Sequence, residues 1–119
     1  MADKLVIIAT HGPKEPERAT IPFVMALAAL VLDTEVVVGL QMDGVELAVK
    51  GAVDNVHAEG FAPLAGLLSD FRDLGGRLLV CSPFLAPRGI DPANLLEGTE
   101  QVAAARLLIE TTDANLLTY

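Results

Sequence analysis

Three short, uninterrupted runs of apolar residues stand out along the chain, within residues 4–10, 34–41 and 77–82. Each run has the length of a strand and is rich in Val, Ile and Leu, which is typical of strands buried on both faces of a sheet. Each run ends at a segment that contains glycine or proline, and these residues favour a turn over continuation of the strand. The pattern therefore predicts three buried strands.

Between and after these strands, apolar side chains recur at intervals of three and four residues, which is the period of an amphipathic helix. This period predicts helices over residues 17–32, 45–50, 63–74 and 100–112. The side chains predicted to face inward are Val24, Leu27, Ala28 and Val31 in the first of these helices, Leu64, Leu67, Leu68, Phe71 and Leu74 in the third, and Val102, Ala105, Leu108 and Ile109 in the last.

Strands that alternate with helices through short loops pair in parallel and are joined by right-handed crossovers. A further short segment at residues 115–119 predicts an edge strand. The sequence therefore predicts an α/β fold, a three-layer α/β/α sandwich with a mainly parallel sheet of about five strands. It shows no internal repeat, linker or low-complexity tract, so residues 1–119 are expected to form one domain.

The charge balance narrows the classes of partner. Sixteen acidic and eight basic side chains give a formal net charge of −8, which repels nucleic-acid phosphates and anionic membrane surfaces. No apolar run reaches the roughly 18–20 residues that span a bilayer. We expect neither a nucleic-acid nor a membrane partner. The first residues lack the pattern of a signal peptide and the single cysteine, Cys81, has no internal disulfide partner, so a reducing, cytoplasmic location is expected.

Candidate chemistry gathers just beyond the predicted strands. In a parallel α/β sheet, ligands bind outside the carboxyl ends of the strands, and the loops at residues 11–16, 41–45 and 81–89 meet that condition. The sequence alone does not establish which strands are neighbours. The candidate catalytic or site-lining residues in these loops are His11, Gly12, Gln41, Asp43, Cys81, Ser82 and Arg88.

Each candidate has a functional and a structural interpretation. Cys81 could act as a thiolate nucleophile next to a cation, or it could be a small apolar residue of the core. His11 could act as a general base, or it could order its own turn. The two histidines and one cysteine have no zinc-site spacing, so no metal is expected. Neither a phosphate-binding glycine loop nor a hydrolase triad pattern is present.

Several motifs, taken in order, resemble the DsrE/DsrF-like family of small sulfur-relay proteins. The resemblance runs nearly from end to end, and the order and separation of the motifs are more specific than any one of them. It also strengthens the prediction of a final strand. The motifs are IATHG (8–12), PERA (16–19), LQMDGV (40–45), LVCSP (79–83), RGI (88–90) and DANLLTY (113–119).

The resemblance implies a function and an assembly. Active members of that family accept sulfane sulfur as a persulfide on a cysteine that Cys81 matches, and they pass it to the cysteine of a partner protein. Cys81 would then be a sulfur carrier or sulfurtransferase residue that needs no cofactor, with His11 and Arg88 polarising or gating the site. Relatives often carry a second cysteine where this chain has Phe84, so the second thiol must come from a partner. The family also implies assembly as a homotrimer, a homohexamer or a heterohexamer, and we expect a homo-oligomer here.

A rival function stays open at this point. The protein would then be a non-catalytic, oligomeric module whose crevice binds a small ligand or docks another protein, and Cys81 would be structural. A stand-alone reductase of the peroxiredoxin type is less favoured, because the sequence has no resolving cysteine and no C-x-x-C motif.

Overall fold

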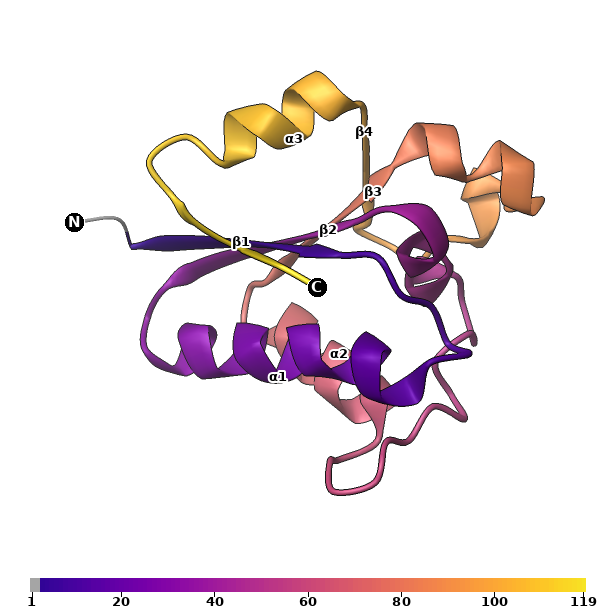
Figure 1. Cartoon of the computed structure of the whole chain (residues 1–119), viewed down its shortest axis with the longest axis horizontal. Coiled ribbons are helices and arrows are strands. Elements are labelled where there is room, and N and C mark those ends of the chain that lie inside the picture. Colours follow the sequence, from indigo (N-terminus) through magenta and orange to yellow (C-terminus); the bar gives the residue numbers. More distant parts are fainter. Residues whose placement is uncertain (1–2) are drawn as a thin grey trace.

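A computed structural model describes residues 3–119 and places a five-stranded, fully parallel sheet at the centre of the fold (Figure 1). The strand order β4-β3-β2-β1-β5 confirms the predicted α/β class, and the segment predicted as an edge strand is the edge strand β5. The strands are β1 (Lys4–Ala9), β2 (Glu35–Leu40), β3 (Arg77–Cys81), β4 (Glu100–Val102) and β5 (Asn115–Thr118).

Helices cover both faces of the sheet. α1 (Pro16–Val31) and α2 (Leu64–Asp73) lie on one face, and α3 (Ala104–Glu110) lies on the other (Figure 1). The first two helices match the predicted segments, whereas the short helix predicted over residues 45–50 is a 3₁₀-helix, Met42–Ala48. No helix among residues 3–119 combines the length and the hydropathy that a membrane-spanning segment needs.

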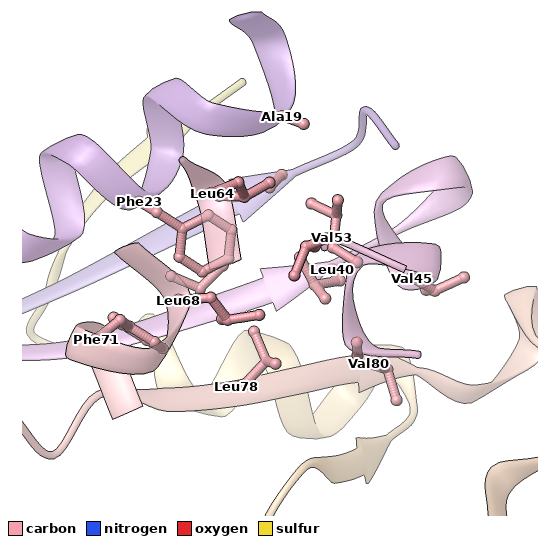
Figure 2. Packing of buried hydrophobic residues seen from close by; sticks show 14 of the residues in the cluster. Ala19, Phe23, Leu40, Val45, Val53, Leu64, Leu68, Phe71, Leu78 and Val80 are labelled. Carbon is pink, nitrogen blue, oxygen red and sulfur yellow. The ribbon is translucent and has the colours of Figure 1, made fainter. Parts of the chain in front are cut away.

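The larger core lies between the sheet and the α1–α2 layer (Figure 2). Alternate residues of β2, such as Val38 and Leu40, point into it, as the period of two requires. Phe23 of α1 and Phe71 of α2 meet edge to face, with ring centroids 5.5 Å apart and planes at 82°. Such a pair stabilises the fold by about 0.5–1.5 kcal/mol beyond the contribution of its buried apolar area. It therefore fixes how the two helices lie together.

A smaller core fills the space between the sheet and α3. It contains Cys81 together with Val6, Val37, Leu79, Val102 and Leu107. Gly39 of β2 leaves room for the helix, because an added Cβ would lie 2.8 Å from Cδ1 of Leu107. The side chain of Leu107 therefore packs directly over the backbone of the sheet at this point.

The predicted inward face of α1 is only partly right, because Leu27 packs against the larger core but the side chains buried most deeply are others. The helix buries Phe23 and Ala26, together with Ala19, Thr20 and Pro22, while Val31 is 74% exposed and Ala28 is also exposed. Almost every side of this helix carries apolar side chains, so the period alone does not determine which side meets the sheet. The packing of Phe23 against Phe71 selects the buried side.

The prediction of one helix over residues 100–112 is wrong, although Val102, which was predicted to face inward, is buried in the smaller core. Its first residues form strand β4, and α3 begins only at Ala104. The helix turns Leu107 and Glu110 inward, whereas Leu108 and Ile109 are 69% and 59% exposed and Ala105 is exposed. Because the carboxylate of Glu110 has cationic partners on β1 and β3, a charged residue occupies the face where an apolar one was predicted.

Candidate functional site

The loops that follow β1 and β2 press against each other at the carboxyl edge of the sheet. The backbone N–H of Gln41 donates to the carbonyl of Ala9 at 3.0 Å. A Cβ added to Gly44 would lie 2.3 Å from the same carbonyl oxygen, and one added to Gly12 would lie 2.7 Å from the carbonyl oxygen of Asp43. Both positions therefore need glycine, because a side chain at either one would overlap the backbone of the neighbouring segment.

Cys81 and Gln41 lie side by side at this edge. β2 and β3 pair in parallel with Leu40 opposite Val80, so Gln41, which directly follows β2, comes next to Cys81, the last residue of β3. The side-chain amide Nε2 of Gln41 donates to Sγ of Cys81 at 3.7 Å. The thiol is 4% exposed and belongs to the smaller core, against which Phe84 also packs. An N–H donor stabilises negative charge on the sulfur atom.

Arg88 joins the second loop to the third. Its Nε and Nη2 donate to Oδ1 of Asp43 at 3.0 and 2.9 Å, and its Nη1 donates to the carbonyl of Phe84 at 3.3 Å. The guanidinium also lies 5.6 Å from the centroid of the Phe84 ring. Arg88 thus holds in place an aromatic ring that packs against the smaller core, and its guanidinium forms an ion pair with Asp43.

Ser82 follows the thiol directly and opens a short 3₁₀-helix, Ser82–Phe84. Its carbonyl accepts a hydrogen bond from the N–H of Leu85 at 3.1 Å. This turn reverses the chain immediately after β3, which brings Phe84 back over the smaller core. Ser82 therefore shapes the site through its backbone.

His11 lies in a separate group at the start of α1. Its Nε2 is 3.4 Å from Nη1 of Arg18 and 3.7 Å from Oε2 of Glu15, and its Nδ1 is 3.3 Å from Oγ1 of Thr10. A cavity of about 220 Å³ at this position is lined by His11, Arg18, Ile21 and Tyr119. Because β2 separates β1 from β3, the structure brings Gln41 beside the thiol and leaves His11 with its own neighbours.

Two features of the structure were not predicted from the sequence. A cavity of about 530 Å³ lies between α2 and the two segments around residues 49–54 and 96–98, and none of the predicted site residues lines it. A second, apolar groove of about 280 Å³ lies beneath α3 and includes Gln41. Both are formed by segments far apart in the chain, so no local pattern reveals them. Within residues 3–119, no group of three or more His, Cys, Asp or Glu side chains could hold a metal ion.

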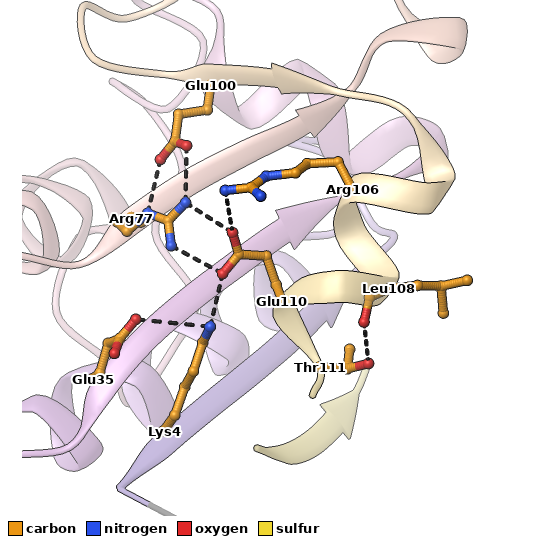
Figure 3. Close-up of polar contacts among 8 residues, drawn as sticks. All are labelled: Lys4, Glu35, Arg77, Glu100, Arg106, Leu108, Glu110 and Thr111. Atoms are coloured by element: carbon orange, nitrogen blue, oxygen red, sulfur yellow. Dashed lines mark hydrogen bonds and ion pairs between the residues drawn. The ribbon is translucent and has the colours of Figure 1, made fainter. Parts of the chain in front are cut away.

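An ionic cluster at the other end of the strands was also missed (Figure 3). The Glu110 carboxylate is 4% exposed and accepts hydrogen bonds from Lys4 at 2.8 Å and from Arg77 at 2.9 and 3.0 Å. Hydrogen bonds from Arg77, which has the larger effect, and from Lys4 lower the pKa of Glu110 from 4.5 to about 2. Hydrogen bonds from Arg77 also lower the pKa of Glu100, and both carboxylates raise the pKa of Arg77.

Comparison with known proteins shows to which family the chain belongs. A model of the DsrE/DsrF-like family matches residues 3–118. The chain belongs to this family. It is 38% identical over 106 residues to the uncharacterized protein MJ0760 of Methanocaldococcus jannaschii, an alignment that covers 89% of this chain and 38% of that protein. The DsrE-like chain therefore spans well under half the length of that curated relative.

Solved structures share the fold. The ychN protein from E. coli superposes with a TM-score of 0.82 at 23% identity, with all of both chains covered. MTH1491 from Methanobacterium thermoautotrophicum, a protein of unknown function, superposes with a TM-score of 0.71 at 17% identity, with 98% of both chains covered. The DsrE-like sandwich predicted from the sequence is thereby confirmed.

Proposed function

We propose that this protein is a sulfur-relay protein, in which Cys81 carries sulfane sulfur as a persulfide and transfers it to the thiol of a partner. The observation that carries the proposal is the contact between the Gln41 amide and Sγ of Cys81 at the carboxyl edge of the sheet. Membership of the DsrE/DsrF-like family supports the same role, because that family is associated with sulfur relay.

The chemistry needs one thiolate and no cofactor. The Cys81 thiolate attacks the outer sulfur of a donor persulfide R–S–S–H, the donor S–S bond breaks, and R–S⁻ leaves as Cys81–S–S–H forms. A partner thiolate then attacks the outer sulfur of Cys81 and restores the Cys81 thiolate. Neither exchange changes the total number of electrons or protons. Gln41 supplies an N–H donor for the negative sulfur in both steps.

The partner has to supply a thiol, because Cys81 is the one cysteine of the chain. A free thiol that cycles in this way fits a reducing, cytoplasmic setting. We also propose a homo-oligomer, a trimer or a hexamer, since large apolar side chains lie exposed on the outer side and at the end of α1. Sedimentation measurements test this assembly. These exposed side chains are Met25, Val31 and Leu32.

A second function is favoured by the burial of the thiol. At 4% exposure and among apolar neighbours, Cys81 also suits a structural residue of a non-catalytic binding module. In that case, replacement of Cys81 by Ala leaves ligand or partner binding nearly unchanged. The two functions differ in whether sulfur reaches Cys81 in the folded protein.

Intact mass spectrometry tests the proposal directly. Native wild-type protein and Cys81→Ser are incubated with a sulfane-sulfur donor and measured before and after a reductant. We expect wild type alone to gain sulfur and to lose it on reduction. If native wild type stays unmodified while the unfolded protein reacts, Cys81 is a core residue and the binding module is the better function.

A further inference from the structure

An apolar groove lies between α3 and the β1–β5 side of the sheet, on the same face as the thiol of Cys81. Its volume is about 280 Å³, just below the range of about 300–1,000 Å³ for pockets that hold drug-sized molecules. The side chains that form it include Ile8, Gln41, Leu107, Leu108, Thr111 and Leu116. Leu108 is 69% and Leu116 is 50% exposed, so the groove is open to solvent.

The groove carries no charged side chain, although the chain as a whole has a net charge of −8. The Thr111 hydroxyl donates to the carbonyl of Leu108 at 2.7 Å, so its donor is already used. The other polar side chain of the groove is Gln41. A ligand here is held by apolar contact, and the surrounding negative charge of the protein disfavours an anionic ligand.

The groove is connected to the thiol by two residues. Gln41 lines the groove and also donates from Nε2 to Sγ of Cys81 at 3.7 Å. Leu107 lines the groove and packs in the same small core as Cys81. The side chain of Gln41 therefore stands between the groove and the sulfur atom, and a molecule in the groove is placed next to the amide that contacts the thiol.

We propose that this groove binds the uncharged alkyl or aryl group of a small organic persulfide, R–S–S–H, which delivers its outer sulfur to Cys81. The proposal rests on the proposed sulfur-carrier role of Cys81 and deepens it by naming the class of donor. The Cys81 thiolate forms a bond to the outer sulfur, the S–S bond of the donor breaks, and R–S⁻ leaves, so the persulfide hydrogen stays on the transferred sulfur. The small volume of the groove restricts R to a short group.

The test compares two donors on matched variants. Butyl persulfide has a small apolar group, whereas glutathione persulfide has a large charged one. Leu108→Asp puts a carboxylate into the groove, and Ile109→Asp puts one on the next residue of α3, which is similarly exposed and does not line the groove. The measured quantity is the second-order rate constant for sulfur loading of Cys81, followed by intact mass.

We expect wild type and Ile109→Asp to load faster from butyl persulfide than from glutathione persulfide. Leu108→Asp should lower the butyl persulfide rate by roughly tenfold, as for loss of a small apolar subsite, and should change the glutathione persulfide rate no more than Ile109→Asp does. Equal rates for the two donors, with no effect of Leu108→Asp, contradict the proposal while leaving the sulfur-carrier role intact. A change in sedimentation of Leu108→Asp without a change in donor preference would make the groove an interface between copies and also contradict it.

Binding can be tested without sulfur transfer. Butyl methyl sulfide has the same apolar group and no transferable sulfur, and its binding is followed by the NMR shift of the Gln41 side-chain amide. If this thioether shifts the Gln41 signal in wild type but not in Leu108→Asp, the groove binds the group even if Cys81 fails to load from any donor. The absence of a shift in wild type at concentrations at which butyl persulfide loads Cys81 overturns the proposed groove.

Discussion

Arg77, the first residue of β3, donates hydrogen bonds of 2.9 and 3.0 Å to Glu110, the last residue of α3 (Figure 3). Lys4 of β1 and Arg106 of α3 also contact the same carboxylate, at 2.8 and 3.2 Å. A carboxylate that is 4% exposed is stable only when its charge is compensated, and here three cations compensate it. The cluster therefore fixes the end of α3 to two strands of the sheet.

Glu110→Gln should lower the free energy of unfolding by about 1–3 kcal/mol, because the charged hydrogen bonds from Lys4 and Arg77 lose their acceptor charge. Urea denaturation measures this change. The matched control is Glu35→Gln, since the Glu35 side chain is 57% exposed and lies 3.8 Å from the same Lys4. The control should change the stability by less than about 0.5 kcal/mol. Equal effects of the two substitutions would contradict the assigned role of Glu110.

The same carboxylate should make stability depend on pH in the acid range. Its pKa in the folded protein is about 2, below the ordinary value of 4.5, so its contribution is complete above about pH 4.5 and is lost as the pH falls toward 2. A shift of this size corresponds to about 3 kcal/mol. The difference in unfolding free energy between wild type and Glu110→Gln should therefore shrink steadily over this range. A difference that stays constant from neutral pH to about pH 2 would show that Glu110 is not held ionised.

The buried strands and the positions of α1 and α2 were predictable, because a buried strand is apolar throughout and an amphipathic helix has a clear period. The inward side of α1 was not predictable. Its apolar residues surround the helix, and the contact between Phe23 and Phe71 depends on a second helix far along the chain. The face of α3 was mispredicted because the partner of Glu110, Arg77, is 33 residues away.

The position of the candidate site could be predicted from the sequence, but the contacts among its residues could not. The sequence located the loops that follow β1, β2 and β3, since chain breakers mark the carboxyl ends of strands. The strand order determines the contacts, and it puts Gln41 next to Cys81 while His11 joins Arg18 at the start of α1. The apolar groove depends on α3 and β5 together, so no single motif indicates it.

Gly44→Ala should destabilise the protein by about 1–3 kcal/mol, because the added methyl group would overlap the backbone of β1. The nearest atom, the carbonyl oxygen of Ala9, would be 2.3 Å away and cannot move without disturbing the strand. Gly66→Ala is the matched control, since Gly66 lies in α2 with nothing within 4 Å of an added Cβ. Thermal or urea unfolding should show Gly66→Ala to be more stable than wild type by about 0.5–1 kcal/mol. If both substitutions changed the free energy of unfolding in the same direction, the close approach of the first two loops would be contradicted.

Gln41→Glu should slow the alkylation of Cys81 by iodoacetamide in the native protein at neutral pH by about tenfold. The substitution keeps the size of the side chain but replaces the N–H donor that contacts Sγ with a carboxylate, which disfavours the reactive thiolate. Mass spectrometry follows the fraction alkylated over time, and Cys81 is the one site to count.

Glu46→Gln is the control for this last prediction, because it changes a charge in the 3₁₀-helix Met42–Ala48, which directly follows Gln41. Its alkylation rate should stay close to that of wild type. Alkylation of the unfolded proteins gives a reference in which Gln41 has no fixed relation to the thiol, so wild type and Gln41→Glu should then react alike. If the two native proteins also react alike, the Gln41 amide does not control the sulfur, and the observation that carries the sulfur-relay proposal is lost.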